Sequence, residues 1–202
     1  MDFRLTFEGP LNGPTGGNSR VAHKHDIRKK FHRQLKRLWE VNPFLNSKWT
    51  TVWDQNKHLE STYGASRATL LAPHFRRGAF TFIPLVERDL SLLCSINILF
   101  LRPDQPGDTL KSGDIDNRLK TIFDALCIPQ HLEQLGGITK PDEGEEPFFC
   151  LLEDDSLITH LSVETDMLLQ PTGERFDVND ARLVITVKIR PYNVNPGNQG
   201  FG

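Results

Sequence analysis

The segment from Leu90 to Leu101 constrains the fold most strongly, because it is nearly continuously apolar. Its apolar residues include Leu92, Leu93, Cys94, Ile96, Ile98, Leu99 and Phe100. A run of this length is too short to cross a bilayer, which takes about 20 apolar residues. A strand covered on both faces has this pattern, so the segment predicts the central strand of a sheet.

Periodic patterns predict the other elements of the fold. Apolar residues that alternate with polar ones indicate strands, which we expect at Asp2–Glu8, Gly78–Val86, Ser156–Thr165 and Ala181–Arg190. Apolar residues that recur every three or four positions indicate helices, which we expect at Arg20–Glu40 and Ile115–Cys127. Asn42-Pro43 ends the first of these helices, because proline disfavours helical geometry in the residue before it. The sum predicts a two-layer α+β fold with a mixed sheet of about five strands and two main helices.

The chain has the length of one domain. We expect this domain to span residues 1–191, with insertions near 42–77 and 128–152. Residues 192–202 are rich in Asn and Gly and predict a flexible tail.

The cysteines and the first residues indicate the compartment. The three cysteines are widely spaced and never occur as a Cys-x-x-Cys pair, which argues against a disulfide framework or a zinc knuckle. The start of the chain has no basic-then-apolar signal pattern. We therefore expect a cytoplasmic protein with no membrane segment.

Charge is segregated along the chain although the formal net charge is only −2. From Arg20 to Glu40 eight basic residues face two acidic ones, and from Glu133 to Asp155 eight acidic residues face Lys140 alone. The local field decides where a polyanion docks, so the average does not exclude nucleic acid as a partner.

The basic helix has two interpretations. Its charges can form an ordinary solvated face, or they can follow a nucleic-acid backbone, because clustered lysines and arginines release counterions from phosphates. The candidate DNA-binding residues are Lys29, Lys30, Arg33, Lys36 and Arg37, and the loop Gly9–Ser19 is a further candidate. No carboxylate or cysteine stands at ligand spacing from His23, His25 and His32, which predicts surface positions for them.

Two acidic motifs carry the candidate chemistry. Asp114 and Asp116 precede the second helical pattern, and Asp154 and Asp155 precede a strand pattern. If Asp114 lies in an extended lead-in and Asp116 at the helix start, their carboxylates can converge, and hard oxygen ligands suit Mg²⁺ or Mn²⁺. Each acid taken singly is also explained by helix capping or turn formation. Lys120 stands at ion-pair spacing from Asp116 and Asp124.

The segments GDIDNRLKTIFDAL and LEDDSLITHLSVE resemble the RusA-like Holliday-junction resolvases. The resemblance implies that Asp114, Asp116 and Asp155 hold Mg²⁺, with Mn²⁺ as an alternative, and that Lys120 assists at the scissile phosphate. Asp154 competes with Asp155 for the inward position. The resemblance further implies a homodimer that cuts branched DNA, because a four-way junction has approximate two-fold symmetry.

Several alternatives stay open at this stage. A related nuclease in a phage or antiphage-defence assembly could cut another DNA structure, with the acidic insertion as the surface for a protein partner. A DNA-binding module with a degenerate site would bind without cutting. A nucleotide-sugar transferase also uses an Asp-x-Asp metal site, but no alternation of strands and helices typical of nucleotide-binding folds precedes the motif.

Overall fold

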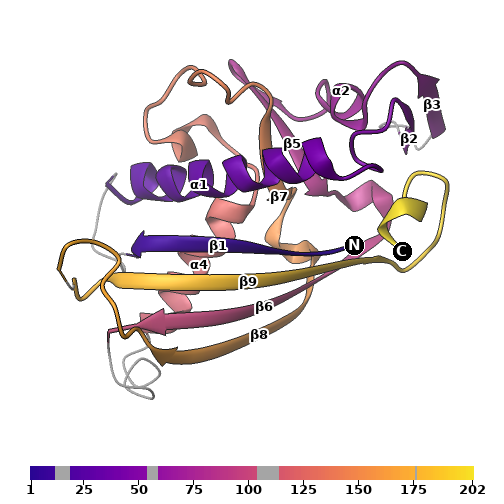
Figure 1. The fold of residues 1–202 in the computed structure, drawn as a ribbon. Helices are drawn as coiled ribbons and strands as arrows, with labels where there is room; N and C mark the ends of the chain where they lie inside the picture. Colours follow the sequence, from indigo (N-terminus) through magenta and orange to yellow (C-terminus); the bar gives the residue numbers. More distant parts are fainter. Residues whose placement is uncertain (12–18, 54–58, 104–113, 176) are drawn as a thin grey trace.

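A computed structural model describes residues 1–11, 19–53, 59–103, 114–175 and 177–202. The larger sheet has the strand order β1-β9-β6-β8. Its strands span Asp2–Pro10 (β1), Leu92–Arg102 (β6), Ile158–Met167 (β8) and Asp180–Pro191 (β9). β9 pairs antiparallel with β1 and with β6, while β8 pairs parallel with β6, so the sheet is mixed (Figure 1).

A second sheet lies on the other side of the long basic helix. Its strands are β4 (Arg76–Arg77), β5 (Phe80–Val86) and β7 (Phe148–Leu152), of which β5 and β7 run parallel. Strands β2 (Trp49–Trp53) and β3 (Leu59–Tyr63) form an antiparallel hairpin apart from both sheets. The single sheet of about five strands was therefore wrong in detail, because the strands divide between two mixed sheets of four and three strands in the described part of the chain.

The structure contains the two main helices that the sequence predicts. Helix α1 spans Ser19–Val41, and helix α4 spans Asp114–Leu126. A shorter helix, α2, spans Arg67–Leu71. Short 3-10 turns lie at Arg88–Leu90 (η1), Leu132–Leu135 (η2), Asp155–Leu157 (η3) and Gln199–Phe201 (η4). Helix α1 packs against β1 on one side and β7 on the other, which ties the two sheets together (Figure 1).

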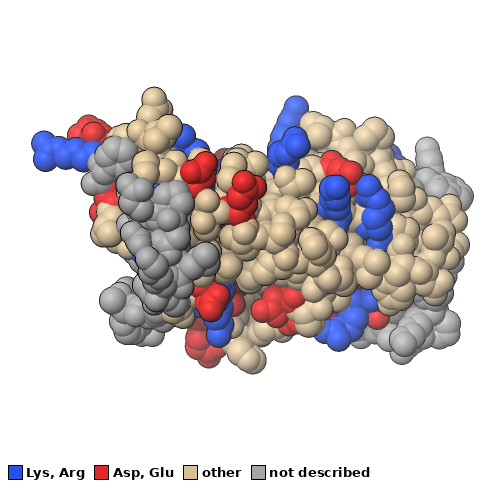
Figure 2. All heavy atoms as spheres, turned by 90° about the horizontal axis from the view of Figure 1, so that it is seen from below, with Lys and Arg blue, Asp and Glu red and all other residues tan. Residues whose placement is uncertain are grey.

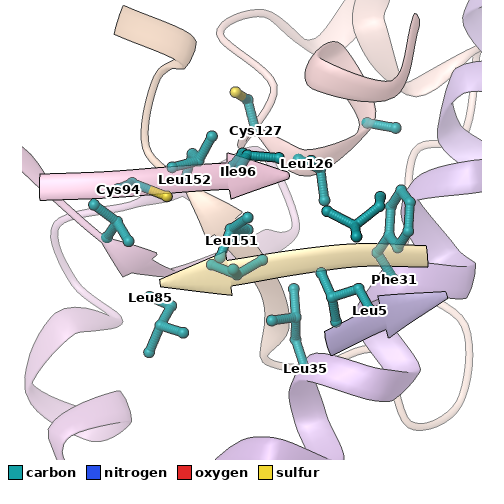
Figure 3. Packing of buried hydrophobic residues seen from close by; sticks show 14 of the residues in the cluster. Leu5, Phe31, Leu35, Leu85, Cys94, Ile96, Leu126, Cys127, Leu151 and Leu152 are labelled. Atoms are coloured by element: carbon teal, nitrogen blue, oxygen red, sulfur yellow. The ribbon is translucent and has the colours of Figure 1, made fainter. Parts of the chain in front are cut away.

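The main core lies between the larger sheet, α1 and α4. Figure 3 shows Phe31 and Leu35 of α1 pointing toward Leu5 of β1, with Leu126 of α4 close by. These side chains are all at most 1% exposed. In the central strand β6, buried residues alternate with half-buried ones and with the exposed Leu93, so it is covered fully on one face only, whereas the sequence predicts cover on both.

Residues 128–152, expected as an insertion, contribute to the interior. They contain η2 and the strand β7, whose five residues are all buried. Residues 42–77 contain the β2–β3 hairpin and α2.

The C-terminal residues differ from the expected flexible tail. Asn198 and Phe201 are fully buried, and the Asn198 side chain donates hydrogen bonds to the carbonyls of Leu90 and Asn193. The amino group of Met1 donates to the carbonyl of Phe201, so the two ends of the chain meet. Asn and Gly composition alone predicted fraying, but a buried aromatic ring overrides it.

All three cysteines, Cys94, Cys127 and Cys150, are free and buried. Of the helices in the part of the chain that the structure describes, none combines the length and the apolar character needed to cross a bilayer.

Candidate functional site

Helix α4 begins at Asp114, so this residue is helical and does not lie in the extended lead-in that the sequence predicts. The side chain of Asp114 lies outside the described residues. Asp116, Lys120 and Asp124 follow at intervals of four residues, which places them along one side of the helix. Asp116 and Lys120 are exposed, and Asp124 is half-buried.

Buried contacts hold α4 with this stripe outward. Ile115, Ile122 and Leu126 are buried in the main core. Arg118 is 5% exposed, and its guanidinium donates a hydrogen bond to the carbonyl of Leu11. Because the buried residues lie on one side of α4 and the charged stripe on another, their burial fixes the rotation of the helix about its axis.

A cavity of about 130 Å³ lies beside the last turn of α4. Its lining brings together Asp124, Asp154 and Asp155 from two distant parts of the sequence. Lys24 of α1 forms an ion pair with Asp124. Arg28, also in the lining, is 3% exposed and donates hydrogen bonds to the carbonyls of Cys127 at 3.2 Å and Asp124 at 2.8 Å.

Asp154 and Asp155 have different local roles. The Asp154 carboxylate caps the turn η3, accepting hydrogen bonds from the backbone amide of Ser156 at 3.0 Å and from its hydroxyl. These hydrogen bonds from Ser156 hold the pKa of Asp154 below its ordinary value. Asp155 is exposed at the mouth of the same cavity. Of the two acids, Asp155 is the one not committed to a cap.

Within the chain, Asp116 and Asp155 lie near opposite ends of α4. Asp155 lines the cavity with Cys127, which follows the end of α4, whereas Asp116 stands near its start. Residues 116 and 127 are separated by about 16 Å along a helix that rises about 1.5 Å per residue. The cause is topological: β8 starts beside Cys94 at the beginning of β6, while the chain leaves the end of β6 to enter α4.

This separation bears on the expected divalent ion. Aspartate oxygens have the right donor chemistry for Mg²⁺ or Mn²⁺. Among the described residues, however, no group of three His, Cys, Asp or Glu side chains is arranged to hold a metal ion. The side chain of Asp114 is not among these residues, so the expected set of Asp114, Asp116 and Asp155 stays a prediction.

The basic helix is only partly open. Lys29 forms ion pairs with Asp142 at 2.5 Å and Glu145 at 3.1 Å, and Lys36 donates to the carbonyl of Gly144 at 2.8 Å. Lys30 donates to the carbonyl of Glu8 at 2.7 Å and lies over the ring of Phe7.

The two arginines of the predicted DNA-binding set are exposed. Arg37 pairs with Glu40 at 3.2 Å. Arg33 forms no ion pair with any residue that the structure describes. Residues 12–18 of the expected DNA-binding loop Gly9–Ser19 lie outside the described residues.

The prediction of surface histidines was wrong for His25 and His32. Both are at most 2% exposed, and the His32 ring stacks on Phe149 and lies tilted against Phe148. Burial, with the nearby Arg28 charge, lowers the pKa of His25 to about 4. Both histidines lie on the side of α1 that packs against β7. The sequence analysis did not predict β7 as a strand.

Sequence reasoning missed Asp124 and Lys24 as part of the cavity. The four-residue spacing of Asp116, Lys120 and Asp124 was visible, but it indicated only surface ion pairs. The pairing of Asp124 with Lys24, a hundred positions away, depends on how α1 crosses α4.

Charged side chains are mixed on the face that contains β8. Figure 2, which views the molecule from that side, shows Lys and Arg interspersed with Asp and Glu over a largely uncharged surface. Comparison of the chain with protein-family models, with curated proteins and with solved structures finds no match.

Proposed function

We propose that this protein is a divalent-metal-dependent endodeoxyribonuclease of the RusA-like kind, acting on Holliday junctions or other branched DNA in the cytoplasm. The observation that carries the proposal is the exposed side of α4. There an Asp-x-Asp-Asn sequence opens the helix and Lys120 follows Asp116 by one turn, on a face that a DNA strand can reach. Free, buried thiols at Cys94, Cys127 and Cys150 agree with a reducing compartment.

The proposed roles follow from charge and position. Asp114 and Asp116 are the proposed ligands of Mg²⁺ or Mn²⁺ at the start of α4, and Asp155 is the proposed third carboxylate. Hydrolysis of a phosphodiester builds negative charge on the phosphate oxygens, and a fixed cation close to them lowers the barrier. Lys120 is exposed on the same side of the helix as Asp116 and is the proposed cation.

The proposed assembly is a homodimer. Two copies related by a two-fold axis match the approximate symmetry of a four-way junction and can cut opposing strands. A second chain also adds carboxylates to those that one chain supplies, which matters because Asp116 and Asp155 of one chain lie apart. The protein partner expected on residues 128–152 stays a prediction.

Cleavage of matched DNA substrates tests the proposed activity. The substrates are a synthetic four-way junction, a flap, a single strand and a linear duplex, each with Mg²⁺, with Mn²⁺ and with EDTA. We expect metal-dependent cutting of the junction that falls at least 100-fold in Asp116→Asn and Lys120→Met, with binding retained. The matched control is Glu174→Gln, an exposed acid outside both motifs and outside the cavity lining, which should cut at the wild-type rate.

A DNA-binding module without catalysis is the second candidate, favoured by the separation of Asp116 from Asp155. It predicts junction binding with no cleavage under any metal condition. That result, obtained with folded protein, would contradict the nuclease proposal.

A further inference from the structure

The acidic loop of residues 141–146 lies directly on the basic face of α1. Asp142 and Glu145 form ion pairs with the ammonium of Lys29, and the carbonyl of Gly144 accepts a hydrogen bond from Lys36 at 2.8 Å. His32 reaches the same carbonyl, with 3.2 Å between its Nε2 and the Gly144 oxygen. The loop thus places carboxylate and carbonyl oxygens where a nucleic-acid backbone would place phosphate oxygens.

The loop has its own internal support. The backbone amide of Asp142 donates to the Glu145 carboxylate, and the amide of Glu145 donates to the Asp142 carbonyl, both at 3.0 Å. Glu145 is 7% exposed, whereas Asp142 and Glu143 are exposed. A turn closed in this way holds its shape while its acidic side chains face the helix and the solvent.

Electrostatics favours the contact. Partial burial lowers the pKa of Lys29, but the hydrogen bonds that its ammonium donates to Asp142 and Glu145 outweigh this effect, so its pKa is raised overall. The hydrogen bond from Lys29 in turn lowers the pKa of Asp142. Both groups are therefore charged near neutral pH, and the ion pair competes with any polyanion for Lys29.

A groove remains open between the loop and the helix. Its basic lining residues are Lys29, Arg33, Lys36 and Arg37, and its acidic ones include Asp142 and Glu143. Arg33 and Arg37 are exposed to solvent on the basic face. Lys29 forms an ion pair with the loop, and Lys36 donates a hydrogen bond to it.

We infer that the loop of residues 141–146 is an intramolecular phosphate mimic that limits how tightly α1 binds a nucleic-acid backbone. DNA must displace Asp142, Glu145 and the Gly144 carbonyl to engage Lys29 and Lys36. Arg33 and Arg37 are exposed, and the loop does not pair with either of them. The inference rests on the DNA partner of the proposed function and does not depend on cleavage.

Binding of a 20-base-pair duplex and of a four-way junction, measured without divalent metal across a series of salt concentrations, tests it. The variant is Asp142→Asn with Glu143→Gln, and the matched control is Glu164→Gln with Glu174→Gln. Both variants change the net charge equally, but the control acids lie outside the groove. A thermal melt checks that each variant folds.

We expect the loop variant to bind at least 3-fold more tightly than the control. Its plot of log affinity against log salt should be steeper by about 0.9 for each lysine that gains a phosphate. Adding Lys29→Met to the loop variant should remove most of the gain. Equal affinity and slope in loop variant and control would overturn the inference.

A result that contradicts the proposed nuclease function differs from a result that contradicts the loop inference. Binding by every variant without metal-dependent cleavage contradicts the nuclease and leaves the loop inference standing. Absence of DNA binding by wild type and loop variant alike overturns both.

Discussion

Glu87 and Arg67 show how one residue pair can couple the fold to pH. They form an ion pair at 3.2 Å with side chains 8% and 1% exposed, and Arg67 also donates to the carbonyl of Gly197 at 2.9 Å. Burial, opposed by Arg67 and assisted by the charges of Glu153 and Asp89, raises the pKa of Glu87 to about 7. An unfolded glutamate titrates near 4.5.

The direction of the pH effect follows from this raised pKa. Between about pH 4.5 and 7 the folded state holds a proton on Glu87 that the unfolded state has lost. The contribution of Glu87 to stability is therefore complete below pH 4.5 and is lost as the pH rises through 7.

Glu87→Gln tests this coupling, because glutamine cannot ionise. We expect the free energy of unfolding of wild type to fall relative to that of Glu87→Gln by on the order of 2 kcal/mol between pH 5 and pH 8. Urea unfolding followed by tryptophan fluorescence at the two pH values measures the difference. A difference that stays constant with pH would rule out a raised pKa at Glu87.

For single residues, the sequence indicated which side chains are candidates for the site better than it indicated whether a side chain is buried. Asp155 was chosen as the ligand candidate over Asp154, and the cap at Ser156 now explains what Asp154 does. The buried histidines could not be foreseen, because His25 and His32 share α1 with exposed lysines and differ from them only in facing β7. Whether Asp116 and Asp155 act on one ion stays a prediction.

At the scale of single elements, the packing of η2 on α1 depends on a close approach of their backbones. Gly136 ends η2 with φ of 67°, and a Cβ built there would lie 2.8 Å from the Cα of Ala22 in α1. The neighbouring Gly137 also has a positive φ, of 86°, but has nothing within 4 Å of such a Cβ.

These two glycines form a matched pair for mutation. Gly137→Ala should cost about 1–2 kcal/mol of unfolding free energy, the cost of left-handed geometry for a residue with a Cβ. Gly136→Ala should cost about 1–3 kcal/mol more, because the methyl group meets rigid backbone. Chemical denaturation of both variants measures this, and equal losses would show that η2 does not pack tightly on α1.

Elements were predicted where their patterns are local. The apolar stripe of α1 and the alternation of β9 are set within each segment, so their bounds match the sequence expectation within a few residues. Strand pairing is not local. Segments Gly78–Val86 and Leu90–Leu101 were expected as strands of a single sheet, yet β5 and β6 belong to different sheets.

At the scale of the whole molecule, the first and last residues of the chain pack together. Phe201 is fully buried beside Phe44, with the guanidinium of Arg67 over its ring at 5.5 Å. This arrangement makes the last residues part of the core, which composition could not indicate.

Truncation of this ring tests the closure. Phe201→Ala should lower the unfolding free energy by about 3–5 kcal/mol, the usual cost of removing a buried aromatic ring. The control Val194→Ala, at a side chain 67% exposed in the same segment, should change it by less than about 0.5 kcal/mol. Similar small effects in both would mean that the segment does not contribute to the core.

The proposed nuclease activity depends on carboxylates from both acidic motifs gathering at one divalent ion. Counting bound Mn²⁺ per chain by electron paramagnetic resonance tests this directly, with wild type, Asp116→Asn, Asp155→Asn and the control Glu174→Gln. We expect one ion per chain bound by wild type and control, with affinity at least tenfold weaker in both aspartate variants. Wild-type affinity in Asp155→Asn, or no ion bound by wild type, would contradict it.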